Sequence, residues 1–219
     1  MEYRSLSDVL REQFGTKVYK LSLSAGCTCP NRDGTAGYGG CTFCSEGGSG
    51  DFAEAPAPLA EQIERAVQRV SRKIPASIPL KDRKYIAYFQ SYTNTYGDQE
   101  RLKALFAEAA SHEQIAAVSI GTRPDAVTDD MISFLAQLNS RKPVWIELGL
   151  QSIHEKTARR IHRGYALPVF EEMYHKLRAA DLTVIVHVIL GLPGESREEM
   201  LDTVRYLAGL RPVLQGIKL

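Results

Sequence analysis

The sequence lacks the features of a secreted or membrane protein. Its first residues, 1–8, carry no apolar stretch after a charge, and no run approaches the length that spans a bilayer. The formal net charge is only +1, so no global field draws the chain to nucleic acid or to an anionic membrane. We therefore expect a cytoplasmic protein with no membrane partner, and a local basic patch stays open.

Several common catalytic motifs are also missing. The chain has no Gly-x-Ser-x-Gly elbow, no Walker loop and no His-Glu-x-x-His helix, which excludes the hydrolase, nucleotide-binding and zinc-protease readings that depend on them. With 219 residues, of which 44% are hydrophobic and 24% charged, the composition is that of an ordinary globular protein with a sizeable core.

Cysteine is absent except from one short glycine-rich segment, which holds all four: Cys27, Cys29, Cys41 and Cys44. In a reducing cytosol such clustering favours metal binding or catalysis over disulfides. The spacing C-x-C-x11-C-x2-C fits zinc held by four sulfurs, and equally an iron-sulfur cluster held by four cysteines or by three with one iron open. Only a reactive cluster needs to face converging polar loops, and the surroundings of this segment therefore favour iron and sulfur.

Apolar periodicity predicts strands alternating with helices. Strands are expected over 17–24, 85–90, 116–121, 144–150, 183–190 and 214–219, and helices over 59–72, 100–110, 129–138, 153–162, 168–180 and 197–207. Near-continuous apolar strands separated by helices indicate a parallel sheet, either of barrel type or doubly wound. Periodicity alone does not separate the two.

Polar and glycine-rich segments follow the carboxyl ends of five strands, beginning with the cysteine segment after the first. Barrel enzymes assemble their sites from loops at one such rim, whereas doubly wound sheets concentrate theirs at a switch point. The sequence therefore favours a partial (β/α)6 TIM-type barrel of parallel strands, with the cysteine loop after the first strand. The chain stops inside the sixth expected strand, and we expect a C-terminal region beyond it.

Together these motifs resemble a known family. The strings Cys29-Pro-Asn-Arg-Asp-Gly and Gly39-Gly-Cys-Thr-Phe-Cys44 resemble the radical S-adenosylmethionine (AdoMet) enzymes, in the branch of the Elongator catalytic subunit and most closely the YhcC-type proteins. The resemblance continues in family order through 88–96, 121–125, 147–152, 162–164 and 190–195. It covers nearly the whole chain, which we treat as one radical SAM core domain over residues 1–219.

The resemblance implies a mechanism. Cys29, Cys41 and Cys44 would hold a [4Fe-4S] cluster whose open iron binds AdoMet, and a one-electron reductant such as flavodoxin or ferredoxin would drive cleavage to a 5′-deoxyadenosyl radical. Cys27 is expected to pack as a small apolar residue. The rival interpretations are a zinc-stabilised structural or binding module and an electron-transfer protein that uses all four cysteines.

The resemblance also suggests a substrate and AdoMet contacts, but names no catalytic residue. The Elongator branch acts on the wobble uridine of tRNA, although here the only dense basic cluster is 159–163. The expected cofactor-binding residues are Gln90, Tyr92, Thr93, Asn94, Thr122, Arg123, Asp125, Glu147, Gln151, Arg163, His187 and Gly191.

Structural alternatives stand beside these contacts. The segment 90–94 is equally interpreted as an Asn/Thr turn that caps a helix, and either arginine as part of an ion pair. Glu147 is open between ligand contact and a buried salt bridge, and His187 fits a core histidine more often than a catalytic one.

Overall fold

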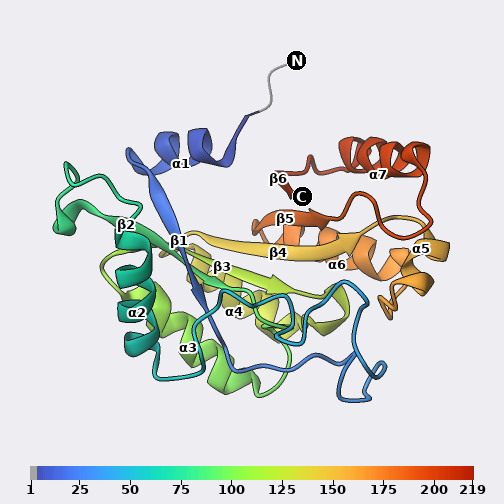
Figure 1. Cartoon of the computed structure of the whole chain (residues 1–219), viewed down its shortest axis with the longest axis horizontal. Coiled ribbons are helices and arrows are strands. Elements are labelled where there is room, and N and C mark those ends of the chain that lie inside the picture. The colour runs from blue at the N-terminus through green and yellow to red at the C-terminus, as the bar shows by residue number, and fades with distance from the viewer. Residues whose placement is uncertain (1–3) are drawn as a thin grey trace.

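One parallel sheet organises the chain. The computed structural model describes residues 4–219, and its six strands pair in chain order from β1 to β6 and curl into a half-barrel (Figure 1). The strands are β1 Val18–Leu23, β2 Lys84–Phe89, β3 Ile115–Thr122, β4 Val144–Gln151, β5 Thr183–Val188 and β6 Gly216–Lys218. The predicted fold class, a partial (β/α)6 barrel, is confirmed.

Helices connect the strands and cover the outer face of the sheet (Figure 1). They are α2 Leu59–Ser71, α3 Gln99–Ser111, α4 Asp129–Asn139, α5 Glu155–Arg160, α6 Leu167–Ala179 and α7 Arg197–Gly209, with short 3-10 turns at Leu80–Asp82 and Pro124–Ala126. The main core lies between helices and sheet, as where the Phe89 and Phe106 rings meet edge to face at 5.2 Å. From β1 to the end of the chain, every predicted helix and strand is present and only the ends differ. The differences are largest for α5, β5 and β6, which are shorter than expected.

Side-chain caps explain where several helices begin. Thr128 accepts a hydrogen bond from the Met131 backbone at the start of α4, and Ser196 forms a capping box with Glu199 at the start of α7. Each cap satisfies a backbone N–H that the first helical turn leaves without a partner.

A helix before the first strand was not predicted. Helix α1, Leu6–Phe14, begins with a capping box between Ser5 and Asp8. Its Leu10 packs in a second, small core with residues near the beginnings of the strands, among them Trp145. These residues face the inside of the half-barrel, so α1 covers the inner face of the sheet at its N-terminal end.

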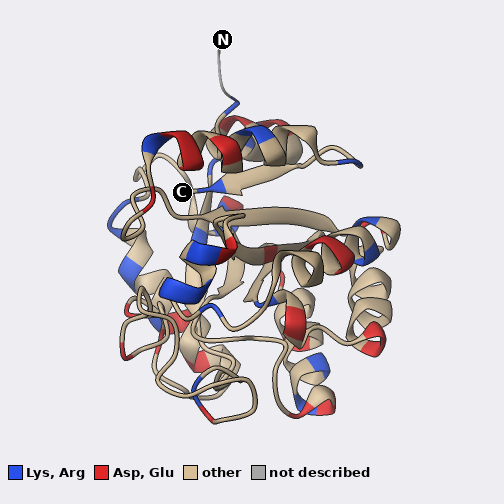
Figure 2. Cartoon of the chain, turned by 90° about the vertical axis from the view of Figure 1, so that its right-hand side faces the viewer, with Lys and Arg blue, Asp and Glu red and all other residues tan. Residues whose placement is uncertain are grey.

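The surface carries no dominant charge. Basic and acidic residues are interspersed along the helices seen in Figure 2, in keeping with the net charge of +1. Within residues 4–219, no helix has both the length and the apolar character needed to cross a bilayer.

Candidate functional site

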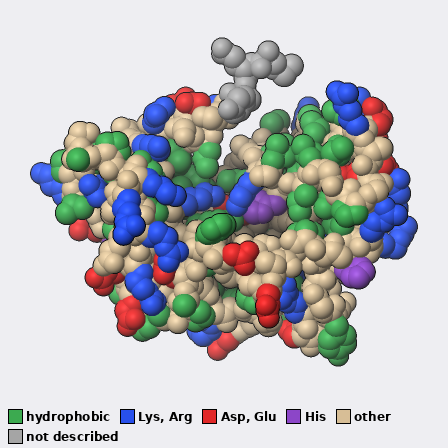
Figure 3. Space-filling view, viewed as in Figure 1, with side chains coloured by type: hydrophobic (Ala, Val, Ile, Leu, Met, Phe, Trp, Pro, Cys, Tyr) green, Lys and Arg blue, Asp and Glu red, His purple; other side chains and the backbone are tan. Residues whose placement is uncertain are grey.

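A cavity of about 380 Å³ opens where the carboxyl ends of the strands meet the cysteine loop. Its walls come from that loop and from strands β2 to β6. Figure 3 shows the molecule hollowed at its centre, with a histidine at the mouth beside lysine or arginine side chains. The rim where the sequence placed its polar loops is therefore a single recessed site.

The cysteine loop is folded tightly around this cavity. The Arg32 backbone N–H bonds to the Cys29 carbonyl at 2.8 Å, and the Gly40 N–H bonds to the Asn31 carbonyl at 2.8 Å. Gly48 adopts a φ of +65°, and a Cβ there would lie 2.3 Å from the Tyr92 ring. Only glycine fits that turn, because the loop backbone crosses directly over the ring.

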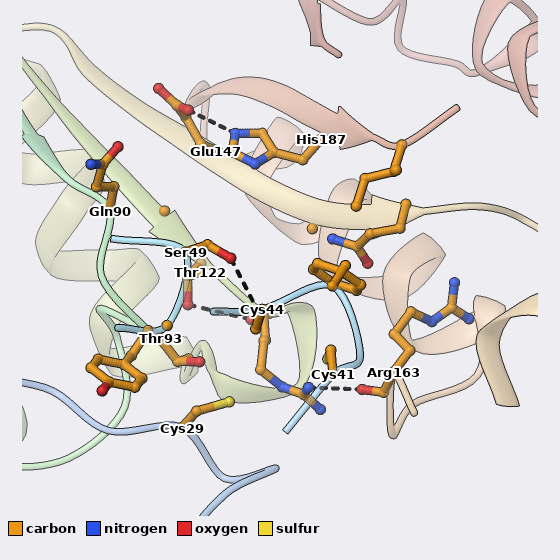
Figure 4. Close-up of a pocket in the computed structure, with 18 of the residues that line it drawn as sticks. Cys29, Cys41, Cys44, Ser49, Gln90, Thr93, Thr122, Glu147, Arg163 and His187 are labelled. Carbon is orange, nitrogen blue, oxygen red and sulfur yellow. Dashed lines mark hydrogen bonds and ion pairs between the residues drawn. The ribbon is translucent and has the colours of Figure 1, made fainter. Parts of the chain in front are cut away.

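The structure brings three of the four cysteines to this cavity. Cys29, Cys41 and Cys44 are free thiols that line it, and each is partly exposed (Figure 4). Within residues 4–219, no three His, Cys, Asp or Glu side chains are already drawn together as a closed metal cage. The three sulfurs thus share one wall of an open site.

Hydrogen-bond donors reach two of these sulfurs. Asn31 Nδ2 lies 3.4 Å from Cys41 Sγ, and Ser49 Oγ lies 3.3 Å from Cys44 Sγ. Hydrogen bonding from Cys41 and from the Ser49 hydroxyl lowers the pKa of Cys44 to about 6, despite burial, and the pKa of Cys41 is raised in turn. A thiolate is the form that binds metal, so this donor set fits an iron-sulfur cluster.

Cys27 lies elsewhere. It is partly buried, packs against the main core and has the Arg101 guanidinium 4.0 Å from its sulfur. Burial raises its pKa, so the neutral thiol is favoured. Its surroundings are those of a packing residue, and they differ from those of the three cysteines that line the cavity.

Most of the predicted AdoMet contacts line the same cavity. These are Gln90, Tyr92, Thr93, Thr122, Arg123, Glu147, Gln151, Arg163 and His187. Two of them, Tyr92 (φ +60°) and Gln151 (φ +64°), hold left-handed backbone conformations, which cost non-glycine residues about 1–2 kcal/mol each. Such strain concentrates at functional sites.

The two arginines are partnered within the protein. Arg123 forms a bidentate ion pair with Asp125, at 2.9 and 2.6 Å, and its Nη1 donates to the Arg163 carbonyl at 2.7 Å. Although burial opposes it, the Asp125 carboxylate leaves the Arg123 pKa raised. Arg123 therefore ties the end of β3 to the loop after α5.

Arg163 braces the exit of β4. It is 1% exposed, and its Nη1 donates to the carbonyls of Leu150 and Ser152 at 2.9 and 2.6 Å. Its Nη2 makes no hydrogen bond among residues 4–219, with the Glu155 carboxylate at 3.5 Å. That nitrogen therefore faces the carboxylate of Glu155, which does not line this cavity.

Three predicted contacts do not line the cavity. Asn94 donates to the carbonyls of Phe89 and Gly121 at 3.1 and 2.8 Å, so its amide braces the ends of two strands. It does not cap the next helix, because the N-cap of α3 is Asp98. Asp125 faces Arg123, and the Gly191 N–H points to the Met200 sulfur at 3.1 Å. Asn94, Asp125 and Gly191 therefore contact other parts of the protein instead of the cavity.

Glu147 has the surroundings of the buried salt bridge that was the alternative. Its side chain is 0% exposed, and it binds Lys20, His187 at 2.7 Å and Lys218 at 3.1 Å. The Ser119 hydroxyl adds a bond of 2.6 Å. Burial is the largest influence and would raise the Glu147 pKa, but these partners together lower it well below its usual range.

Sequence reasoning missed the rest of this network. Every strand contributes one inward side chain, and the six residues are Lys20, Tyr88, Ser119, Glu147, His187 and Lys218. We call this set the polar layer. The sequence did contain a signal for this network, because side chains alternate in direction along a strand. A lysine whose neighbours in the strand face the core must itself point inward, and there its charge needs a polar partner.

Comparison with known proteins identifies the family. The model of the "Radical SAM superfamily" matches residues 29–207. The chain belongs to this superfamily. YtqA of Bacillus subtilis is 44% identical over 218 residues, and YhcC of Escherichia coli 38% over 211, covering 99% and 96% of this chain. The chain spans 65% of the length of each relative. The expected relationship to YhcC-type proteins is confirmed.

Solved radical SAM structures share the fold. Coproporphyrinogen III oxidase (HemN) from Escherichia coli aligns with a TM-score of 0.56 at 17% identity, over 98% of this chain and 47% of that one. Elp3 from Methanocaldococcus infernus aligns with a TM-score of 0.56 at 18% identity, over 72% of this chain and 41% of that one. At such identities the likeness concerns the half-barrel alone.

Proposed function

We propose that this radical SAM protein holds a [4Fe-4S] cluster through Cys29, Cys41 and Cys44 and uses it to cleave AdoMet reductively. The observation that carries the proposal is that these three sulfurs line one cavity with the polar ends of the strands, while Cys27 packs elsewhere. Once bound, the cluster supplies the electron that converts AdoMet into a hydrogen-abstracting 5′-deoxyadenosyl radical.

The residues around the cavity have separate tasks in this proposal. Asn31 donates to Cys41 Sγ and Ser49 to Cys44 Sγ, which favours the thiolate form and orients these two cysteine side chains. The amide of Gln151, which lines the cavity, would bind polar groups of AdoMet. The cavity is open, so bulk water would be excluded from the reacting groups only once AdoMet and substrate fill it.

The placement of Cys27 argues against both rivals. A structural zinc site and a four-cysteine electron-transfer cluster each need a fourth sulfur beside the other three. Cys27 instead packs on the main core near Arg101. The three-cysteine interpretation needs no rearrangement of that residue.

For the substrate we propose a base side chain of tRNA, and for the partner a flavodoxin- or ferredoxin-like reductant. The support for tRNA is the sequence resemblance to the Elongator branch, together with a basic rim next to the cavity. Arg159 and His162 lie there beside Tyr38, which is 82% exposed, as suits stacking on an unpaired base. Retention on a tRNA column that is lost in R159A/H162A would support this, and equal elution of both proteins would contradict it.

Anaerobic reconstitution tests the cluster and its open iron together. The reduced protein should show an electron paramagnetic resonance signal typical of [4Fe-4S], and addition of AdoMet should shift that signal, because AdoMet binds an iron that lacks a protein ligand. A colourless protein with one zinc per chain would contradict the proposal. A cluster whose signal ignores AdoMet would instead favour electron transfer.

A further inference from the structure

The polar layer leaves positive charge uncompensated. Two ammonium groups, those of Lys20 and Lys218, share the single carboxylate of Glu147. Burial lowers the pKa of His187, which favours the neutral imidazole. His187 therefore adds neither positive nor negative charge to the polar layer. Among the side chains of the described residues that line the cavity, that of Glu147 is the sole acidic one. A partly buried excess cation is costly unless an anion joins it.

Lys218 has bonding capacity to spare. Its Nζ donates to Glu147 at 3.1 Å and to the Tyr88 hydroxyl at 2.7 Å, and an ammonium has three N–H donors. Lys218 lines the cavity and its side chain is 41% exposed, so the third donor has space for a ligand. Lys20 sits behind it, with its Nζ 4.3 Å from the centre of the same Tyr88 ring.

The layer lies below the rim of the barrel. Glu147 precedes Gln151 by four residues on β4, which is about 13 Å of strand. The labelled cysteines and the Glu147–His187 pair lie on opposite sides of the cavity in Figure 4. A group bound by the polar layer would thus lie across the cavity from the cysteine loop. A substrate must lie there to face a cofactor bound at that loop.

The two lysines also mark the open edge of the half-barrel. Lys20 belongs to β1 and Lys218 to β6, and these are the two edge strands of the sheet. Both reach inward to the same carboxylate on β4. The two ammonium groups therefore come from the first and the last of the six described strands.

We propose that Lys218, backed by Lys20, binds an anionic group of the substrate, a carboxylate or a phosphate. This inference rests on the radical SAM function proposed above, and it adds the chemical class that the substrate must carry. Glu147 then acts as a positioning residue, since it holds both ammonium groups, and His187 completes the polar wall.

The only tryptophan supplies a local probe. Trp145 is 4% exposed and precedes Glu147 by two residues, so both side chains point to the inside of the half-barrel. Cluster-reconstituted protein is titrated with inorganic phosphate and, separately, with acetate, with chloride used to hold the ionic strength constant. The wild type should give a saturable change in Trp145 fluorescence with at least one of the two anions.

Substitutions at two lysines complete the experiment. In Lys218→Met the midpoint should rise at least about tenfold, because a charge-assisted bond is lost, and Lys218→Arg should restore most of the binding. Lys17→Met, at an exposed lysine just before the same strand as Lys20, should stay within about twofold of wild type. Tighter phosphate binding points to a phosphorylated substrate, and tighter acetate binding to a carboxylate.

The outcomes separate this inference from the proposed function. AdoMet cleavage by the wild type is measured in the same preparation. If cleavage occurs but no anion binds, or if Lys218→Met binds as wild type does, the anion site is wrong and the radical function stands. If anion binding depends on Lys218 while clustered protein never cleaves AdoMet, the radical function is wrong and the anion site stands.

Discussion

Asn31 connects the cysteine loop to the segment that follows α5, because its amide nitrogen donates both to Cys41 Sγ, at 3.4 Å, and to the His162 carbonyl. The side chain is 4% exposed. A buried amide with these two partners both orients the cysteine and anchors the loop to the segment after α5. The Asn-Arg-Asp sequence after Cys29 is therefore part of the site as well as a turn.

Asn31→Ala should loosen a bound cluster without unfolding the protein. Removing the donor to Cys41 weakens thiolate stabilisation, and loss of a hydrogen-bond partner of a metal ligand typically costs about 10–100-fold in metal affinity. Iron and sulfide content during incubation with a chelator measures this. Thr35→Val, on the exposed side of the same loop, is the matched control and should retain iron as the wild type does. Equal iron loss in wild type and Asn31→Ala would contradict the role.

Three of the four cysteines should be required for the protein to retain a cluster. Single alanine variants at Cys29, Cys41 and Cys44 should each fail to retain the cluster, since the three ligands are those that line the cavity. Cys27→Ala should keep it. Visible absorbance and iron content after anaerobic reconstitution give the result, and loss of iron from Cys27→Ala alone would overturn the assignment.

Gly48→Ala should distort the loop beside Cys44. The new Cβ would lie 2.3 Å from the Tyr92 ring, in addition to the cost of a side chain at φ +65°. Gly39→Ala is the matched control, because its φ is +78° but nothing lies within 4 Å of the added atom. We expect unfolding free energy to fall by about 1 kcal/mol for Gly39→Ala and clearly further for Gly48→Ala. Similar losses in both variants would show that the clash is relieved at no cost.

Helix α1 should stabilise the inner face of the barrel. Leu10 is 4% exposed in the small core with Trp145, so Leu10→Ala should cost about 2–4 kcal/mol. Leu6 in the same helix is 45% exposed, and Leu6→Ala should change stability by less than about 0.5 kcal/mol. Urea unfolding followed by Trp145 fluorescence compares the two. Equal stability of both variants would mean that α1 is not needed there.

Glu147 should make the stability of the protein depend on acid pH. Its folded pKa lies below the ordinary value of 4.5, so its contribution is present above that pH and is lost as the pH falls below it. The fall from this group should reach about 1.4 kcal/mol per pH unit. Glu147→Gln should lower the unfolding free energy at neutral pH by about 3 kcal/mol. Its unfolding free energy should then fall less steeply at acid pH than that of the wild type.

The control for Glu147 is Glu108→Gln, on the exposed face of α3. Urea unfolding from pH 7 down to pH 3 should give the control the same slope as the wild type. An acid limb that is equally steep in Glu147→Gln would assign the pH dependence to other carboxylates.

The sequence predicted the sheet, and the place of the cysteine loop at its rim, better than it predicted the inside of the barrel. Apolar periodicity located all six strands because the strands bury apolar side chains under the helices, and these recur at every second position. Helix α1 was not predicted because it is short and Leu10 is its only fully buried residue. The contacts of Glu147 were equally hidden, since its partners come from strands more than 25 residues away in the chain.

The contrast between Asn94 and Gln151 has the same origin. Both are polar residues that follow strands, and both were expected to face the cofactor. Asn94 turns to the backbone of two strands, whereas Gln151 lies after a register shift in β4 and lines the cavity. Side-chain direction at such positions depends on pairing with a neighbouring strand, and periodicity within one segment carries no information about it.

Formation of 5′-deoxyadenosine is the most direct test of the central claim. Anaerobically reconstituted protein is mixed with AdoMet and a strong one-electron reductant, and the products are quantified by chromatography and mass spectrometry. The account predicts 5′-deoxyadenosine and methionine from the wild type and from Cys27→Ala, and neither from Cys29→Ala. A wild-type sample that carries a complete [4Fe-4S] cluster and yet leaves AdoMet intact would contradict it.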